Sequence, residues 1–307
     1  MGTPSRPPHH EDRLGRALLS LEGLSVGDAF GSKFFAPPGR DRAIPPPIWR
    51  YSDDTEMALA VVEALDRHDG INRDELALSF ARRYQADPYR GYGLSVRRVL
   101  EGIAGGEPWH ASARSIYGGT GSMGNGGAMR VAPLGAYFAD DLDEVVRQVT
   151  ASAEVTHAHL EGRAGAIATA VAAAWAWQAR NRPRPLPGRA IIALALDHTP
   201  EGETHAGLKR ALSLKLDLPV EEAVGVMGTG SRITALDTVP FALWSAARHI
   251  DDDAEALWTT VSAGGDSDTN CAIVGGIVVL ANGREAIPEG WSAAREPLGW
   301  ESNRRGS

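Results

Sequence analysis

The alanine-rich stretch EGRAGAIATAVAAAWAWQAR, residues 161–180, constrains the fold more than any other part of the chain. Alanine has the highest intrinsic helix propensity, so this long segment is the strongest helix in the sequence. Apolar residues also recur at helical spacing over residues 12–32, 53–65, 73–87 and 239–250. Because the two-residue alternation of strands is nearly absent, the sequence predicts a compact all-α fold with its chemistry on the loops.

Two proline-rich segments, residues 34–50 and 181–189, are predicted to be loops. The second could divide two domains, but candidate site residues lie on both sides of it, so we expect one domain over residues 14–300. Residues 1–13 are expected to form a disordered lead. The β-branched residues of 270–283 are also compatible with a strand, but the length of this segment and its paired glycines favour a closely packed helix.

Charge and composition exclude several classes of function. The formal net charge is −8 and no basic stripe is present, so a polyanionic ligand must be held by local devices such as metals, helix N-termini or glycine-rich loops. No apolar run reaches the length of a membrane helix. Cys271, the single cysteine, excludes an internal disulfide and suits a buried thiol in a reducing cytoplasm. We expect a cytoplasmic monomer with no membrane partner.

Two acid-rich clusters about 200 residues apart each open an apolar helix. They offer four carboxylates and two hydroxyls, from Ser52, Asp53, Asp54, Asp266, Asp268 and Thr269. Either cluster alone could be a helix cap, with Asp53 and Glu56 as a capping box or Asp268 as an N-cap. Together they form the oxygen-donor set that Mg²⁺ and Mn²⁺ prefer, and four packed acids without a cation would repel one another. No histidine–cysteine set supports zinc.

The glycine-rich segment 118–127 contains a G-x-G-x-x-G match, but no strand precedes it, so we reject a dinucleotide-binding unit. Glycine at this density lets the backbone wrap closely around a ligand with its N–H groups pointing inward; the alternative is a flexible loop. His157 and His159 stand at the entrance to the long helix. Either could be a cap or core residue, but His157, directly after Thr156, suits a contact with a sugar.

These pieces together resemble the ADP-ribosylglycohydrolase family over about residues 14–282. The resemblance depends on five motifs in order: GLSVGDAFG, YSDDTEM, GNGGAMRVAPLG, THAHLEG and GGDSDTN. It implies a compact, all-helical single domain with a binuclear Mg²⁺ or Mn²⁺ centre at its rim. It also implies release of ADP-ribose from a mono-ADP-ribosylated acceptor, by attack of a metal-positioned water at the anomeric carbon of the distal ribose.

The resemblance implies a role for each candidate residue. The two metals would be held by Ser52, Asp53, Asp54, Asp266, Asp268 and Thr269. The diphosphate would lie on the backbone of Gly121, Ser122, Met123, Gly124 and Asn125. His157 would contact the ribose–phosphate side of the ligand, and Asp28 would support the site. Asp53 and Asp54 would be catalytic, with Asp54 taking or relaying a proton.

One departure from the family pattern concerns the general base. Many family members carry a glutamate a few residues beyond the glycine that follows this Asp28 motif, where this chain has Lys33, Phe34 and Phe35. The nearest acids are Asp28 and Asp41. The rival function is therefore an ADP-ribose binder that hydrolyses slowly or not at all. A dimetal phosphohydrolase would explain the acids but not the glycine loop or the Thr–His pair.

The acceptor cannot be read from these motifs. Arginine N-glycosides are the first expectation, and serine O-glycosides, a nucleobase or nucleic acid, and a small-molecule conjugate remain alternatives.

Overall fold

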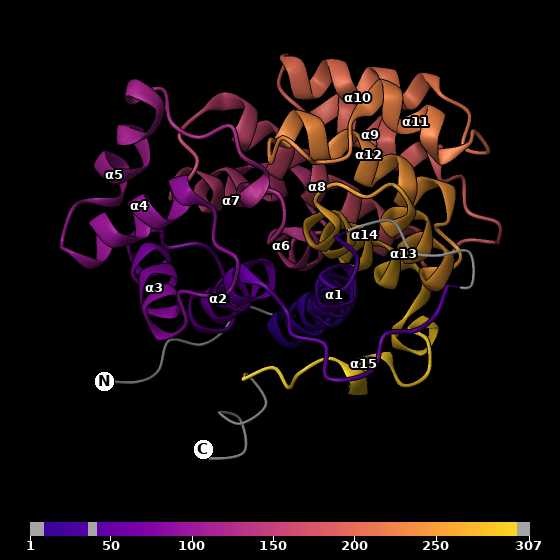
Figure 1. Ribbon diagram of the computed structural model, residues 1–307, viewed down its shortest axis with the longest axis horizontal. Helices are drawn as coiled ribbons and strands as arrows, with labels where there is room; N and C mark the ends of the chain where they lie inside the picture. Colours follow the sequence, from indigo (N-terminus) through magenta and orange to yellow (C-terminus); the bar gives the residue numbers. More distant parts are fainter. Residues whose placement is uncertain (1–8, 36–41, 300–307) are drawn as a thin grey trace.

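Helices make up nearly all regular structure in residues 9–35 and 42–299, the parts that the computed structural model describes (Figure 1). The α-helices are α1 (His10–Gly31), α2 (Asp53–His68), α3 (Arg73–Ala86), α4 (Leu94–Ala104), α5 (Trp109–Ser115), α6 (Ala132–Tyr137), α7 (Leu142–Glu154), α8 (Leu160–Ala179), α9 (Arg189–His198), α10 (Glu203–Ser213), α11 (Val220–Met227), α12 (Ala235–Arg248), α13 (Asp253–Ser262), α14 (Ser267–Asn282) and α15 (Trp291–Ala294). Short 3₁₀ turns are η1 (Ile116–Gly119), η2 (Asn125–Gly127) and η3 (Arg284–Ala286). Within the described residues, β-structure is limited to two isolated bridges, Trp49 with Arg295 and Gly124 with Thr234. The predicted all-α class is confirmed.

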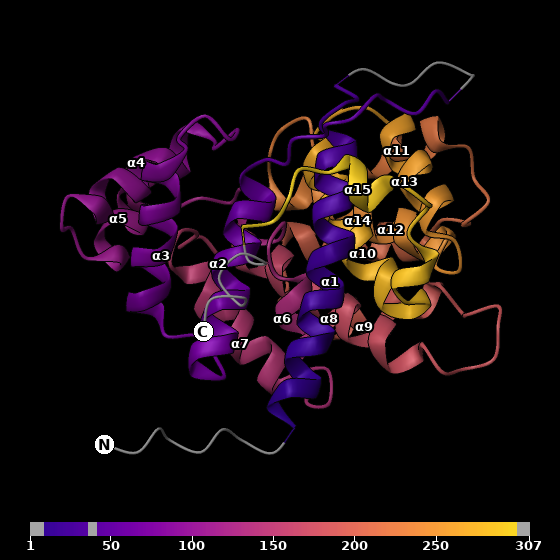
Figure 2. The same cartoon turned by 90° about the horizontal axis from the view of Figure 1, so that it is seen from below.

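Helix α8, the strongest helix of the sequence, lies at the centre of the fold. Its alanines are buried along most of its length, and it packs against α6, α7, α9, α12 and α14. Figures 1 and 2 place α1, α8 and α14 between α3–α5 at one end and α9–α13 at the other. The proline-rich segment 181–189 joins α8 directly to α9, which packs on it, so this segment does not separate two bodies.

The close contact between α1 and α14 is built from glycines. A Cβ atom added to Gly23 would lie 2.3 Å from the carbonyl oxygen of Gly275. One added to Gly27 would lie 2.1 Å from the carbonyl oxygen of Cys271, and one added to Gly31 would lie 2.4 Å from that of Ser267. Side chains at these α1 positions would therefore force the two helices apart. The segment 270–283 forms most of α14, which ends at Asn282, so the helix favoured from its length is confirmed. The contact brings Asp28 on α1 beside the start of α14.

The start of α1 lies inside the segment expected to be a disordered lead. Residues 1–8 of that segment lie outside the described residues, but α1 begins at His10. Glu11 and Asp12 in its first turn favour a helix N-terminus electrostatically. The His10 ring is buried, with Nδ1 2.8 Å from the hydroxyl of Tyr137. Tertiary contact thus orders residues that composition alone assigned to the lead.

None of the described helices has the length and apolar character needed to span a membrane.

Candidate active site

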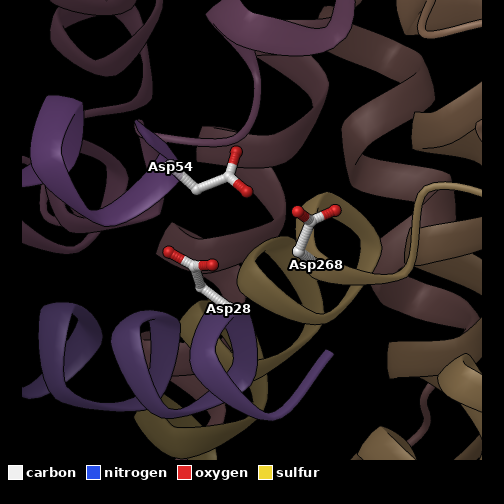
Figure 3. A group of neighbouring side chains, drawn as sticks. All are labelled: Asp28, Asp54 and Asp268. Carbon is white, nitrogen blue, oxygen red and sulfur yellow. The ribbon is translucent and has the colours of Figure 1, made fainter. Parts of the chain in front are cut away.

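Three carboxylates from three helices converge at one point (Figure 3). Asp28 comes from α1, Asp54 from the first turn of α2 and Asp268 from the first turn of α14. One oxygen of each lies within 4.8 Å of the others. Acids of the two clusters, which are about 200 residues apart in the sequence, therefore lie together in the fold.

The α2 turn, residues 52–54, is held by side-chain hydrogen bonds. Ser52 is the N-cap of α2; its Oγ accepts from the Asp54 N–H at 3.1 Å and donates to Asp54 Oδ2 at 3.0 Å. The carboxylate of Asp28 accepts from the Ser52 N–H at 2.9 and 3.0 Å and from Thr55 Oγ1 at 2.5 Å. Ser52 rather than Asp53 caps the helix, so the capping-box alternative for Asp53 is wrong.

The α14 turn, residues 266–269, is held by backbone conformation. Gly265 adopts a φ of 77°, and the Asp266 N–H donates to the Thr229 carbonyl at 3.1 Å. Asn125 Nδ2 donates to Asp266 Oδ2 at 2.6 Å. Asp266 occupies the N-cap position without a side-chain cap bond, so the alternative that Asp268 is the N-cap is also wrong. Capping therefore does not account for the acids of this turn.

Burial and mutual repulsion raise the pKa values of the clustered acids. Burial, and then the charge of Asp268, raises the pKa of Asp28 and that of Asp266 from 3.8 to about 7. The pKa values of Asp53 and Asp54 are raised well above the ordinary value by burial and then by Asp28. No lysine or arginine among the described residues forms an ion pair with these five acids. An all-oxygen cluster of acids without a protein cation fits a hard divalent metal ion, whose charge would favour the ionised carboxylates.

A cavity of about 370 Å³ opens beside the acids, within the usual range for small-molecule sites. Its lining residues are Asp53, Asp54, Met57, Gly91, Gly93, Leu94, Ser95, Val96, Tyr117, Ser122, Met123, Gly124, Asn125, Gly126, Met129, His157, Arg232, Ile233, Thr234, Asp266, Asp268 and Thr269. The acid turns and the glycine-rich loop thus share one cavity, and that arrangement can hold a cation and a ligand together.

Two of the predicted site residues do not line this cavity. Ser52 is placed behind it, with its hydroxyl on Asp54. Gly121 is buried at the foot of the glycine loop, where a Cβ would lie 2.6 Å from the Ala158 side chain. Its φ of 79° gives it a role in the bend of the loop. The other predicted metal and substrate residues all line the cavity.

The two histidines at the start of α8 have different positions. His159 is the N-cap of α8, and its Nδ1 accepts from the Glu161 N–H at 3.1 Å. His157 lines the cavity and is 4% exposed. Burial, and then the charge of Arg130, lowers the pKa of His157 to about 3, so the ring is neutral at physiological pH.

Three exposed apolar side chains at the cavity were not predicted from the sequence. Leu94, Tyr117 and Ile233 are all more than half exposed and line the cavity. Ile233 also has a φ of 56°, which is costly for a β-branched residue. The tyrosine directly before the glycines was the one available signal. Apolar surface at a cavity mouth indicates contact with a ligand.

The aromatic pair that replaces the family glutamate does not reach the acids. The Phe34 ring is buried against Phe30 and Trp258, with ring centroids 4.9 and 5.5 Å away. Phe35 is 74% exposed, and neither residue lines the cavity. The two rings therefore do not lie beside the acids, because Phe34 packs into an aromatic core instead. Asp41 lies outside the described residues.

Comparisons with known proteins agree on one family. Residues 9–303 match the family model described as ADP-ribosylglycohydrolase. ADP-ribosylhydrolase ARH3 of Homo sapiens is 31% identical over 278 residues, which cover 80% of this chain and 74% of that protein. The Xenopus tropicalis ARH3 is 31% identical over 279 residues, covering 81% and 78%. A solved structure titled ADP-ribosylglycohydrolase-related protein complex has a TM-score of 0.61 at 26% identity, and the match covers 93% of this chain and 94% of that one.

Proposed function

Because this chain belongs to the ADP-ribosylglycohydrolase family, we propose that it is a metal-dependent hydrolase that releases ADP-ribose from a mono-ADP-ribosylated acceptor. The observation that carries the proposal is the single cavity that joins the acid turns to the glycine loop. A simple ADP-ribose binder has no need of five clustered acids, four of which have pKa values raised by burial and by neighbouring carboxylates. The acid cluster therefore favours the enzyme over the binder.

Two Mg²⁺ or Mn²⁺ ions are the proposed cofactor. The residues that would hold them are Asp53, Asp54, Asp266, Asp268 and Thr269, with the Asp28 carboxylate close by. Ser52 belongs to the proposed set because its hydroxyl lies 3.0 Å from Asp54 Oδ2, so an ion on that carboxylate would also be next to Ser52. When bound, such ions orient hydroxyl groups and lower the pKa of a water. Their charge would also offset the repulsion among the acids and favour ionised carboxylates.

The cavity supports one orientation of ADP-ribose. The distal ribose would lie at the acid turns, and the diphosphate would lie on the backbone of residues 122–125. Arg232 is the one lysine or arginine among the described cavity residues, which supports a place for the diphosphate charge near it. The adenine would contact the exposed apolar side chains of Tyr117 and Ile233. A flat aromatic base gains most from such a surface.

The proposed reaction is a hydrolysis in which the acceptor leaves with a proton. The water oxygen forms a bond to the anomeric carbon of the distal ribose, while the bond from that carbon to the acceptor breaks. Asp54 takes the proton that the water loses and relays it to the departing acceptor, and Asp53 also lines the cavity. Among the described residues, the acids that line this cavity all belong to the two turns, and of these we assign the general base to Asp54.

The acceptor is tested directly. We propose arginine N-glycosides first, and the protein would be incubated with Mg²⁺ or Mn²⁺ and mono-ADP-ribosylated arginine, serine or nucleic acid. Mass spectrometry would measure the ADP-ribose released, with Asp268→Ala as the inactive control. Release from the arginine conjugate is the expected result. Release from serine or nucleic acid alone would reassign the acceptor, and binding of ADP-ribose without release from any substrate would favour the binder.

A further inference from the structure

A buried chain of three polar side chains leads from the protein interior to the cavity. Arg130 Nη2 donates to Thr156 Oγ1 at 2.9 Å, and Thr156 Oγ1 is 2.8 Å from His157 Nδ1. Arg130 is fully buried, and Thr156 and His157 are 1% and 4% exposed. Solvent therefore does not compete for these hydrogen bonds, and their directions are set by the protein alone.

Arg130 is held in place without an acidic partner. Its Nη2 also donates to the Ser152 carbonyl at 2.8 Å, its guanidinium lies 4.4 Å from the centre of the Phe80 ring, and Nη1 is 3.6 Å from Met57 Sδ. Among the described residues it forms no ion pair with a carboxylate. Burial lowers the pKa of Arg130 to about 9, which leaves it protonated at neutral pH. A protonated guanidinium only donates hydrogen bonds, so Thr156 Oγ1 must accept from it.

The remaining hydrogen bond then has one direction. A threonine hydroxyl carries a single proton, and the described residues offer the Thr156 hydroxyl no acceptor other than His157 Nδ1. Thr156 Oγ1 therefore donates to Nδ1. In a neutral ring whose Nδ1 accepts, the proton is on Nε2. The lowered pKa of His157 agrees with a neutral ring.

The Nε2 atom faces the glycine loop. A Cβ added at Gly124 or at Gly126 would lie 3.3 Å from it, so the absence of side chains there leaves room beside the N–H. Both glycines and His157 line the cavity. A ligand oxygen on this part of the loop is thus within reach of a donor, whereas a donor group of the ligand would find no acceptor on the ring.

We infer that Arg130 is a positioning residue that acts through Thr156 to hold His157 as an Nε2–H donor toward a ligand oxygen on the glycine loop. The inference rests on the proposed function for the identity of the ligand, ADP-ribose. The oxygen belongs to either the diphosphate or a ribose hydroxyl. ADP, which has the diphosphate but lacks the distal ribose, and ribose 5-phosphate, which has a ribose but no diphosphate, distinguish the diphosphate from a hydroxyl of the distal ribose.

The tautomer of His157 can be read by long-range ¹H–¹⁵N NMR of the full chain labelled with [¹⁵N]histidine. His157 would be assigned by its absence in His157→Gln. The wild-type ring should show a protonated Nε2 and an unprotonated Nδ1 without ligand or metal. A protonated Nδ1 in the wild type would overturn the inference, and this result needs no variant to fold.

Two variants of Thr156 test the relay. Thr156→Val removes the hydroxyl at nearly constant volume and should lose the fixed tautomer and weaken ADP-ribose binding about 10-fold, the value of one hydrogen bond. Thr156→Ser keeps the hydroxyl and should retain both. If the diphosphate accepts the hydrogen bond, Thr156→Val should also weaken the binding of ADP. If a hydroxyl of the distal ribose accepts it, Thr156→Val should instead weaken the binding of ribose 5-phosphate.

Unchanged tautomer and affinity in Thr156→Val would contradict the relay. An intact tautomer in a protein that releases no ADP-ribose would instead refute the proposed hydrolase and leave the relay standing.

Discussion

The α2 turn and the α14 turn look alike in the sequence but are positioned by different forces. The α2 turn depends on polar side chains: its own Ser52 hydroxyl, and Asp28 from α1. The α14 turn has no side-chain cap. Besides the hydrogen bond from Asn125 to Asp266, it depends on a glycine with positive φ and on the close glycine packing of α1 against α14. The α2 turn should therefore be sensitive to lost hydrogen-bond partners, and the α14 turn to added side-chain atoms.

Contacts from the C-terminal part of the chain, here called the brace, also hold the α2 turn in place. Glu296 Oε1 accepts from the Tyr51 N–H at 2.9 Å and forms an ion pair with Arg90. The Arg90 carbonyl in turn accepts from the Asp53 N–H at 2.7 Å. The segment before the acids is thus fixed from both sides, and a residue far from the motifs contributes to the geometry of the site.

The largest expected effect is the loss of either acid turn. Asp54→Ala and Asp268→Ala should each lower turnover about 10³-fold or more, because a misplaced cation stabilises neither the water nor the ribose. The exposed Asp143→Asn should leave turnover unchanged. Steady-state release of ADP-ribose is the measurement. A tenfold or smaller loss in one of the two turns would show that the turns do not share one reaction.

The next largest effect should come from adding a side-chain atom where α1 packs against the α14 turn. Gly31→Ala places a Cβ 2.4 Å from the Ser267 carbonyl and should destabilise the protein by about 1–3 kcal/mol while weakening Mn²⁺ binding. Gly15→Ala, in the same helix, has no atom within 4 Å of the new Cβ and should stabilise by up to about 1 kcal/mol. Urea unfolding measures the stability of both variants, and calorimetric titration measures their Mn²⁺ affinity. Equal effects would remove the argument for close packing at the α14 turn.

A smaller effect should follow from the loss of the brace on the α2 turn. Glu296→Gln should weaken Mn²⁺ binding about 10-fold, the usual cost of losing a residue that orients metal ligands. Glu289→Gln, at an exposed position, is the matched control. Calorimetric titration with Mn²⁺ measures the affinity. Identical affinities in the two variants would mean that the C-terminal contact does not position the acids.

The smallest effect is a dependence of stability on pH. The pKa values of Asp28 and Asp266 are raised from 3.8 to about 7, so between these values the folded protein keeps protons that the unfolded chain has lost. The stability of the metal-free protein should therefore fall as pH rises through this window. Mg²⁺ should raise the melting temperature by several °C more at pH 7.5 than at pH 5. An equal gain at both pH values would contradict this electrostatic account.

Local sequence patterns predicted the helices and the two acid turns because both depend on residues that are close together in the sequence. The apolar stripe of α2, the alanines of α8 and the acids at 53–54 and 266–268 need no knowledge of their neighbours. Glycines also mark the α1–α14 contact, although the carbonyls that face them are known only from the fold.

Long-range partners could not be predicted. Nothing around Asp28 indicates that it accepts hydrogen bonds from Ser52 and Thr55, and nothing near Glu296 indicates contact with Tyr51. The same is true of Phe34, whose aromatic neighbours come from distant helices. These contacts arise from tertiary packing, and the order of motifs along one chain does not reveal which distant residues pack together.

The most direct test of the shared site is a titration of metal-free protein with Mn²⁺, followed by electron paramagnetic resonance. We expect two coupled Mn²⁺ ions in the wild type. We also expect loss of that coupled signal in both Asp54→Ala and Asp268→Ala, although the two acids lie in turns about 200 residues apart. A wild-type signal that persists in either variant would contradict the claim that the two turns form one metal site.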